Sequence, residues 1–286
     1  MHRSGPKLVT TVAQLREALA AVRRAGQKIG FVPTMGALHA GHLSLVRAAE
    51  TECDCVVVSI YVNPSQFGPQ EDFSRYPRTL ENDISLLAGC RTDLVFAPTD
   101  EEVYRPSHAT WVEVGPLAGL LEGACRPGHF RGVATIVLKL LGMVQPEAAY
   151  FGQKDYQQAL ILRRMAADLN LPAAIRICPI VREPDGLAMS SRNRYLSPAA
   201  RQRALVLWQG LELAGQLVHG GQRSAAVIAA QMRDRIETVE PAQIDYVAVV
   251  DPETLEPIEN ITGRTLAALA VKIDNTRLID NCFLEP

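Results

Sequence analysis

Two histidines, His39 and His42, lie three residues apart in the string Pro-Thr-Met-Gly-Ala-Leu-His-Ala-Gly-His. In a helical turn this spacing places both imidazoles on one side, and Gly41 between them lets a flat ligand approach the backbone. Residues 28–33 are expected to form a strand and residues 40–52 a helix. A helix N-terminus offers N–H groups and positive potential that attract phosphate. The pattern therefore predicts a site for a nucleoside triphosphate.

Two other interpretations of this pair remain open. The histidines could be ordinary surface or core side chains, or they could bind zinc through their imidazoles. A zinc site needs a third ligand, and none follows at a familiar spacing. Nor does a glutamate lie between the two histidines, as it does in the helix of a zinc protease. The glycines and the expected strand-turn-helix setting favour phosphate.

A second polar cluster follows the apolar, β-branched run at 55–62. Asn63 and Gln66 lie there in the string Asn-Pro-Ser-Gln-Phe-Gly. Amide side chains at the end of a strand suit a ligand that is rich in hydroxyl and carboxylate oxygens. Taken alone, the same string is also typical of an ordinary Asn-Pro turn.

A third cluster, Gly152, Lys154 and Asp155, follows the expected strand 148–151 and precedes a helix. Lysine is a mobile point charge, which suits a phosphate whose geometry changes during a reaction. The alternative is that Asp155 caps the helix and Lys154 is solvated. The glycine spacing of a P-loop is absent from this string.

Two further stretches contain arginine. Residues 189–193, Met-Ser-Ser-Arg-Asn, lie in a polar connection, where serine hydroxyls and the Arg192 guanidinium would be good partners for oxyanions. Residues 126–133, Arg-Pro-Gly-His-Phe-Arg-Gly-Val, contain two glycines that could simply form turns.

The string around the histidines closely resembles the His-x-Gly-His signature of the nucleotidyltransferase superfamily, which includes class I aminoacyl-tRNA synthetases. In its fuller form, residues 33–42, it resembles the pantothenate synthetase family, whose members join pantoate to β-alanine with ATP. The superfamily's Lys-Met-Ser-Lys-Ser loop corresponds to a stretch in which Ala188 and Ser191 replace the lysines and Arg192 follows. That form is similar to pantothenate synthetases and unlike tRNA synthetases. Five motifs in the same order carry the resemblance as far as Arg192.

The resemblance implies an AMP-forming carbon–nitrogen ligase that works through a pantoyl adenylate, uses ATP and Mg²⁺, and forms a homodimer. A cytidylyltransferase-like member of the same superfamily is the alternative, and a nucleotide-binding regulator without catalysis is a rival of another class. The roles implied are catalysis for His39, His42, Lys154 and Arg192; ATP binding for Met35, Gly41, Gly152, Lys154, Asp155, Ser190, Ser191 and Arg192; pantoate binding for Asn63, Gln66, Arg126 and Gln158; and a contact to Mg²⁺ for Asp83.

Composition excludes several other classes. The chain has 286 residues, 48% of them apolar, with a formal net charge of −2 and a pI of about 6.3, which argues against a nucleic-acid-binding protein. Its longest apolar stretch is too short to span a bilayer, and the first ten residues lack a signal-peptide pattern. The six cysteines include no C-x-x-C pair. They are expected to be buried thiols in a cytoplasmic protein.

Helix and strand patterns alternate over residues 1–181, which predicts an α/β domain with a Rossmann-like, doubly wound parallel sheet. The resemblance implies that this domain binds nucleotide and pantoate. Residues 182–286 predict a second, smaller α+β domain that acts as a lid. The expected helices are 12–24, 40–52, 80–89, 130–143, 156–169, 198–218 and 224–239, and the expected strands are 28–33, 55–62, 94–97, 148–151, 174–181, 244–250, 265–273 and 276–283.

Overall fold

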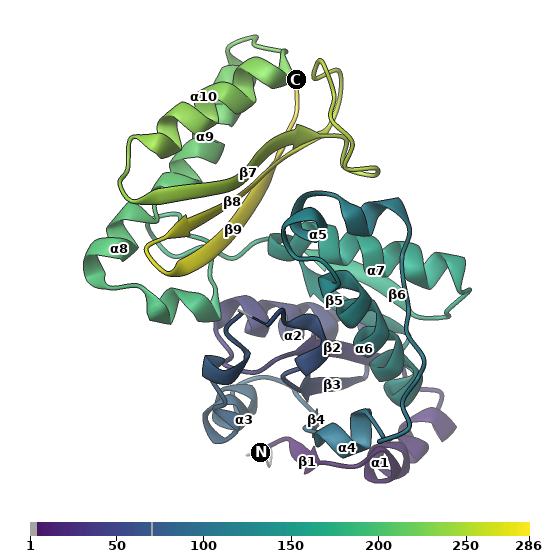
Figure 1. Cartoon of the computed structure of the whole chain (residues 1–286). Coiled ribbons are helices and arrows are strands. Elements are labelled where there is room, and N and C mark those ends of the chain that lie inside the picture. The colour runs from purple at the N-terminus through teal and green to yellow at the C-terminus, as the bar shows by residue number, and fades with distance from the viewer. Residues whose placement is uncertain (1–4, 70) are drawn as a thin grey trace. The chain divides into compact units, whose positions relative to one another are not determined.

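The computed structural model describes residues 5–69 and 71–286, which fold into two compact units (Figure 1). The first unit comprises Met1–Ala118, Arg126–Gly152 and Gln158–Pro179. The second comprises Gly119–Cys125, Gln153–Gln157 and Ile180–Pro286. The second unit therefore includes two short segments that precede residue 158, in addition to the region expected after residue 181.

A six-stranded sheet, entirely parallel, organises the first unit, and its order is β1-β4-β3-β2-β5-β6. The chain moves outward from β2 in both directions, so right-handed crossovers place helices on both faces. This confirms the expected Rossmann-like, doubly wound α/β architecture. The strands are β1 (Lys7–Val9), β2 (Ile29–Thr34), β3 (Cys55–Ile60), β4 (Leu94–Phe96), β5 (Ala148–Gly152) and β6 (Ala174–Cys178).

Local sequence explains why these elements form where they do. Thr11 caps the first helix through a capping box with Gln14, and Leu15 and Leu19 on its inner side are fully buried. The central valines of β3 are fully buried, as expected for a strand covered on both faces. The helices of this unit are α1 (Val12–Arg24), α2 (Ala40–Glu52), α3 (Leu80–Ala88), α4 (Asp100–Val103), α6 (His129–Val144) and α7 (Tyr156–Asp168), whose first two residues belong to the second unit.

The position of β2 matters most for function. It pairs with β3 on one side and with β5 on the other. The connection after β2 leads to β3, whereas the connection after β5 leads away to β6, so the winding direction reverses between β2 and β5. Open α/β sheets bind ligands outside the carboxyl ends of their strands at such a reversal. The string with the two histidines follows β2 at this place.

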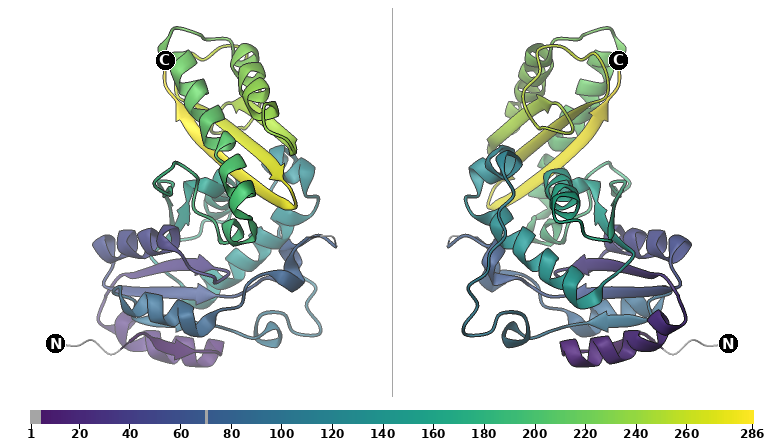
Figure 2. Two further views of the ribbon diagram at one scale, coloured as in Figure 1. Left: turned by 90° about the vertical axis from the view of Figure 1, so that its left-hand side faces the viewer. Right: turned by 90° about the vertical axis from the view of Figure 1, so that its right-hand side faces the viewer.

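The second unit contains a three-stranded antiparallel sheet, ordered β7-β8-β9, with α9 and α10 packed against each other and against it (Figure 2). Leu211, Ile228 and Leu269 join the helices to the sheet in one buried cluster. This confirms a smaller α+β unit. The long expected helix at 198–218 is divided, since α8 ends at Arg203. The elements are α5 (Leu121–Cys125), α8 (Pro198–Arg203), α9 (Val206–His219), α10 (Ala225–Glu237), β7 (Ala242–Val250), β8 (Thr265–Ile273) and β9 (Thr276–Leu284).

Two expectations from composition can be compared with the structure. In the described part of the chain, none of the helices has the length and apolar character needed to cross a membrane. All six cysteines are free thiols, but only Cys53 and Cys55 are buried. Cys125 is exposed, so the expectation that the thiols are generally buried was wrong for this residue.

Candidate active site

The connection between β2 and α2 has an unusual backbone. Gly36 and Ala37 both lie in the left-handed region, with φ values of 82° and 51°. Ala37 carries a side chain, and this conformation is uncommon for such a residue. It is also fully buried, so the surrounding structure has to maintain the conformation. The loop therefore enters α2 along one fixed path.

Asp83 holds this loop in place. Its carboxylate accepts hydrogen bonds from the backbone N–H groups of Ala37 and Leu38 at 3.0 and 2.9 Å, and from the Thr79 hydroxyl at 3.2 Å. Charged acceptors make stronger hydrogen bonds than neutral ones. Asp83 was expected to contact Mg²⁺, but its side chain is fully buried and both oxygens accept bonds from the protein. These bonds make Asp83 an anchor of the histidine loop, and its contact to Mg²⁺ stays a prediction.

The two histidines form the first turn of α2. The Nδ1 atom of His39 accepts the N–H of Gly41 at 3.2 Å, and the Nδ1 atom of His42 accepts the N–H of His39 at 3.3 Å. An accepting Nδ1 carries no proton, so the proton of each neutral ring lies on Nε2. The ring centroids are 4.1 Å apart. The pair thus combines two imidazole N–H donors with the N-terminus of a helix, an arrangement that suits a phosphate chain.

Gln66 lies beside the same loop. Its Nε2 donates to the sulfur of Met35 at 3.0 Å, and its Oε1 accepts from the Nδ2 of Asn63 at 3.1 Å. Gln66 and Met35 are both half-buried, which leaves part of each side chain accessible to a ligand. The structure thus brings two of the predicted site residues into direct contact.

Asn63 supports Gln66 through this bond. It is only 1% exposed, and its Oδ1 accepts from the hydroxyl groups of Ser65 and Tyr104, both at 2.9 Å. Its Nδ2 also donates to the carbonyl of Gly132 at 3.3 Å. Asn63 was expected to bind pantoate, and this stays a prediction. In the structure it is buried and holds the Gln66 side chain by a hydrogen bond.

Gly132 on α6 makes this packing feasible. A Cβ atom at this position would lie 2.2 Å from the carbonyl oxygen of Ser65 and 2.8 Å from the Cα of Gln66. Only glycine lets the helix approach the backbone of residues 65 and 66 so closely. Gly132 lies inside α6, within the helix expected at 130–143, so it serves a close helix-to-loop contact and does not form a turn.

Arg126 forms a bidentate ion pair with Glu71, with N–O distances of 2.6 and 2.7 Å. Burial raises the pKa of the Glu71 carboxyl, but hydrogen bonds and charge from Arg126 outweigh this and leave the pKa below its usual value. His129 next to Arg126 contacts the Gln66 carbonyl through Nδ1 at 2.8 Å. Arg126 was expected to be a cation facing substrate. In the structure its charge is paired with Glu71, and it supports the segment around Gln66.

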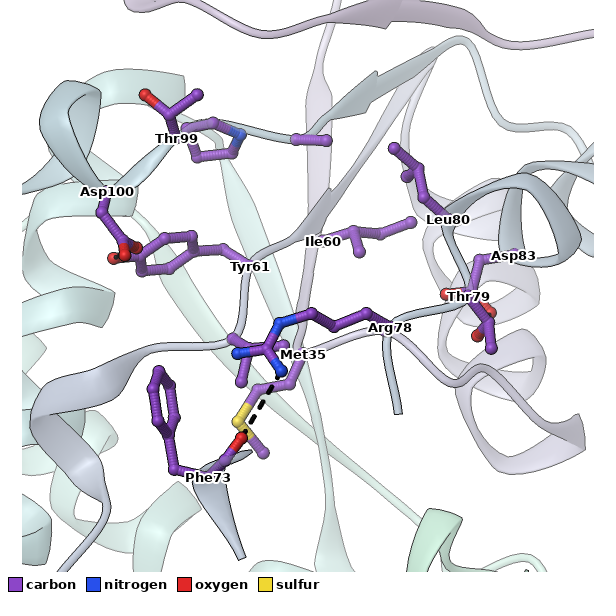
Figure 3. Close-up of a pocket in the computed structure, with 14 residues that line it drawn as sticks. Met35, Ile60, Tyr61, Phe73, Arg78, Thr79, Leu80, Asp83, Thr99 and Asp100 are labelled. Carbon is purple, nitrogen blue, oxygen red and sulfur yellow. Dashed lines mark hydrogen bonds between the residues drawn. The ribbon is translucent and has the colours of Figure 1, made fainter. Parts of the chain in front are cut away.

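A cavity of about 370 Å³ adjoins the other side of the loop (Figure 3). Met35 and Gly36 line it, together with residues that follow β3 and β4 and with Arg78. The Tyr61 hydroxyl donates to Asp100 at 2.9 Å on its wall. Burial and this hydrogen bond raise the pKa of Tyr61, so the hydroxyl stays protonated. The cavity belongs wholly to the first unit.

The second unit contains the remaining predicted cations. Lys154 and Asp155 lie in a 3-10 helix, Gln153–Asp155, with 3.6 Å between the Lys154 Nζ and an Asp155 oxygen. Ser190 caps the 3-10 helix Ser191–Tyr195 by accepting the N–H of Arg192 at 3.3 Å. Both strings therefore occupy short, hydrogen-bonded turns and not regular helices.

The predicted residues divide between the two units. Gln158 is half-buried on the first turn of α7, while its neighbour Gln157 is buried and bonds to the backbone of residues 120 and 122. Among the described residues, no group of three His, Cys, Asp or Glu side chains could hold a metal ion. The first unit contains Met35, His39, Gly41, His42, Asn63, Gln66, Asp83, Arg126, Gly152 and Gln158, and the second contains Lys154, Asp155, Ser190, Ser191 and Arg192.

Comparison with known proteins decides the family. The model of a family described as pantoate-beta-alanine ligase matches residues 7–283. The chain belongs to the pantoate–β-alanine ligase family. The pantothenate synthetase of Moorella thermoacetica is 56% identical over 279 residues, covering 98% of this chain and 99% of that protein. The pantothenate synthetase of a Roseiflexus species is 54% identical with the same coverage.

Solved structures of the pantoate–β-alanine ligase family share the fold. A crystal structure of pantothenate synthetase from Thermus thermophilus has a TM-score of 0.93 and 48% identity, covering 98% of this chain and 100% of that one. The ligase from Francisella tularensis, solved in complex with β-γ ATP and β-alanine, has a TM-score of 0.79 and 33% identity, covering 97% of each chain. These comparisons confirm the family resemblance. The roles of individual residues stay predictions.

Sequence reasoning named Asp83 and Arg126 but missed the contacts through which they support the site, and it missed Glu71 altogether. Asp83 bonds to backbone 45 and 46 positions earlier, and Glu71 pairs with an arginine 55 positions later. Neither partner is marked by a short-range pattern. Gly132 could have been noticed, because a glycine in the middle of an apolar helix usually has a packing reason.

Proposed function

We propose that this chain, as a pantoate–β-alanine ligase, makes pantothenate through a pantoyl-adenylate intermediate. In the first step a pantoate carboxylate oxygen attacks the α-phosphorus of ATP and pyrophosphate leaves. In the second, the amine of β-alanine attacks the acyl carbon and AMP leaves. The observation that carries the proposal is the pair of imidazoles at the N-terminus of α2, each accepting a backbone N–H through Nδ1, in a chain of this family.

The first step needs no general base, because a carboxylate is already ionised at pH 7. The barrier lies in bringing this anion to an anionic phosphate and in stabilising charge on the departing pyrophosphate. We assign this stabilisation to His39 and His42 as N–H donors and to Lys154 and Arg192 as cations. Met35, Gly41, Gly152, Asp155, Ser190 and Ser191 complete the proposed ATP contacts.

Pantoate carries a carboxylate and hydroxyl groups, which amide side chains can bind. Gln66 and Gln158 are the amides we assign to it. Asn63 and Arg126 contribute through Gln66, by the bonds described above. A mixed anhydride hydrolyses readily, so the site has to exclude water until β-alanine arrives.

Mg²⁺ is proposed to enter bound to the phosphates of ATP, as Mg²⁺ commonly does. The described part of the chain offers no cluster of ligands for a separate ion, so no step is assigned to a metal held by the protein. The proposed small-molecule partners are pantoate, β-alanine and ATP. The proposed assembly is a homodimer, and size-exclusion chromatography with light scattering tests the oligomeric state.

Single-turnover kinetics test the chemistry. With ATP and pantoate alone, the enzyme is expected to release pyrophosphate and retain an adenylate, and β-alanine is then expected to release AMP and pantothenate. Stoichiometric ADP would refute the adenylate. Cytidyl transfer from CTP to a phosphate ester, without any need for β-alanine, would instead support the cytidylyltransferase-like alternative.

Substitutions test the residues. His42→Ala and Lys154→Ala are each expected to slow adenylation by at least about 10²-fold, the typical effect of losing one donor to a developing oxyanion. His219→Ala, at the exposed end of α9, is the matched control and should keep full activity. Thermal unfolding separates the roles: a large fall in the melting temperature of His42→Ala would mark the residue as structural.

A further inference from the structure

The last strand of the second unit reaches the turn that contains Lys154. The Nδ2 of Asn281, on β9, donates to the carbonyls of Gln153 and Lys154 at 2.9 and 3.0 Å. Its Oδ1 accepts from the Nε2 of Gln153 at 3.2 Å. Asn281 is only 3% exposed, so these bonds are shielded from water. One buried amide thus makes three bonds to the turn, 127 and 128 positions away in the chain.

These bonds fix the place from which the lysine side chain starts. The 3-10 helix Gln153–Asp155 is only three residues long, and the hydrogen-bond geometry of a 3-10 helix is poorer than that of an α-helix. Asn281 supplies that constraint through two consecutive carbonyl groups. A lysine side chain is long and flexible, so holding the backbone of Lys154 limits the positions that its ammonium group can reach.

The neighbouring residue on β9 fixes a second functional stretch. Asp280 forms a bidentate pair with Arg182, with distances of 2.6 and 3.0 Å. Arg182 also donates to the carbonyls of Gly186 and Asn281 at 3.0 and 3.3 Å. It begins a small hairpin, closed by a bridge to Ala188, that leads directly to residues 190–192. Two adjacent β9 residues therefore hold both strings that carry Lys154 and Arg192, the cations proposed to bind ATP.

We propose that Asn281 is a positioning residue for adenylation, acting through Lys154. The inference rests on the proposed function in one respect, namely that Lys154 stabilises charge on ATP. Asn281 itself contacts no substrate in this scheme. It sets the geometry of the turn, and a misplacement of about 1 Å is enough to cost roughly 10²-fold in rate.

Pantoate-dependent exchange between ATP and pyrophosphate tests the proposal with Asn281→Ala. We expect kcat to fall by at least about tenfold while KM for pantoate stays within about twofold, since a small shift at a catalytic group affects the rate. Thr265→Ala is the matched control, because Thr265 is a buried polar residue of the same sheet whose hydroxyl donates to the Gly263 carbonyl. It should keep its kcat although it loses a buried side-chain hydrogen bond.

A double-mutant cycle separates positioning from general damage. In a Lys154→Ala background, measured by single-turnover adenylation, Asn281→Ala should cause no further loss. If the two losses multiply, Asn281 acts through the fold at large and the proposal is overturned. If Lys154→Ala is slow and Asn281→Ala is fully active, the proposal also fails. If Lys154→Ala keeps full activity, the proposed catalytic role of Lys154 is refuted, and with it the proposal that Asn281 acts through Lys154.

Two further variants protect the test against misfolding of Asn281→Ala. Asn281→Asp keeps the volume and the Oδ1 acceptor, but it places an oxygen against the two carbonyls. It should therefore lose kcat as the alanine variant does. Gln153→Ala leaves β9 unchanged and removes one of the three bonds, so its kcat should fall less. Full activity of both well-folded variants would refute the role of the turn geometry.

Discussion

Replacing Gly132 by alanine should disturb pantoate binding from inside a helix. The added Cβ would lie 2.2 Å from the Ser65 carbonyl oxygen and 2.6 Å from its carbonyl carbon. Both are backbone atoms, so no side-chain rotation relieves the overlap. To reach an ordinary contact of at least 3.4 Å, the backbone of residues 65 and 66 has to move by more than 1 Å. Gln66 moves with it, and its amide is a proposed ligand of pantoate.

Two opposing effects determine the stability of the variant. Overpacking in a well-packed site typically costs about 1–3 kcal/mol, whereas alanine in place of glycine in a helix gains about 1 kcal/mol. The net destabilisation of Gly132→Ala should therefore be between zero and about 2 kcal/mol. The catalytic effect should be larger, because a shift of about 1 Å costs roughly 10²-fold in kcat/KM.

Gly142, further along the same helix, provides a matched control. A Cβ there would meet nothing within 4 Å. Gly142→Ala should raise the melting temperature slightly and leave the kinetics unchanged. The assay is ATP–pyrophosphate exchange with pantoate varied, alongside thermal unfolding of both variants. Equal kcat/KM for pantoate in the two alanine variants would refute the close approach of α6 as a determinant of the Gln66 position.

Three more substitutions have clear expected outcomes. Asp83→Asn should slow adenylation by at least about tenfold, because the Asp83 carboxylate holds backbone N–H groups of the histidine loop. The Mg²⁺ concentration needed for half-maximal rate should not change, and a raised Mg²⁺ requirement would support Asp83 as a metal ligand. In the folded state the pKa of Glu71 is lowered from 4.5, so its ion pair stabilises the protein above that pH, and this stabilisation is lost as the pH falls through the lowered pKa. Glu71→Gln should therefore melt at a lower temperature than the parent at pH 7, and the difference in melting temperature should disappear in acid. Gly186→Ala places a Cβ 2.1 Å from the Trp208 ring, whereas the matched control Gly221→Ala has a similar positive φ but open space around its Cβ. Calorimetry should therefore show a clearly larger loss of stability at position 186, and equal losses of stability would mean that backbone strain alone accounts for the effect.

The regular elements could be predicted because their signals are local. The first helix has its capping box at Thr11 and its buried leucines four positions apart, so its start and its buried side can be assigned from the sequence. The buried valines of β3 gave an equally clear strand. β1, by contrast, is three residues long and buries only Val9, which is too little for a periodic pattern. Its place at the edge of the sheet depends on pairing with β4, far along the chain.

The candidate site could be predicted as a set of motifs but not as a set of contacts. His39 and His42 were found because their spacing is itself the signal. Asn63 was found as an amide that follows a strand, and Arg126 through the family resemblance. The sequence could not show that Asn63 is buried beneath Gln66 or that Arg126 is paired with an acidic residue. Those facts depend on segments that meet only after folding. A sequence motif shows which segment of the chain contributes to a site, whereas burial and hydrogen-bond partners determine which residues of that segment can contact a ligand.

The interleaving of the chain has a consequence for engineering. The second unit cannot be exchanged between homologues as one continuous cassette, because it is assembled from three separate stretches of sequence. Arg277 of β9 donates to both oxygens of Glu122 at 2.7 Å, and Glu122 lies 155 positions earlier on α5. A chimaera joined at residue 180 would inherit the arginine from one parent and its carboxylate from the other. Recombination between relatives is therefore constrained to crossovers that keep residues 119–125 and 153–157 together with the partners that β9 provides.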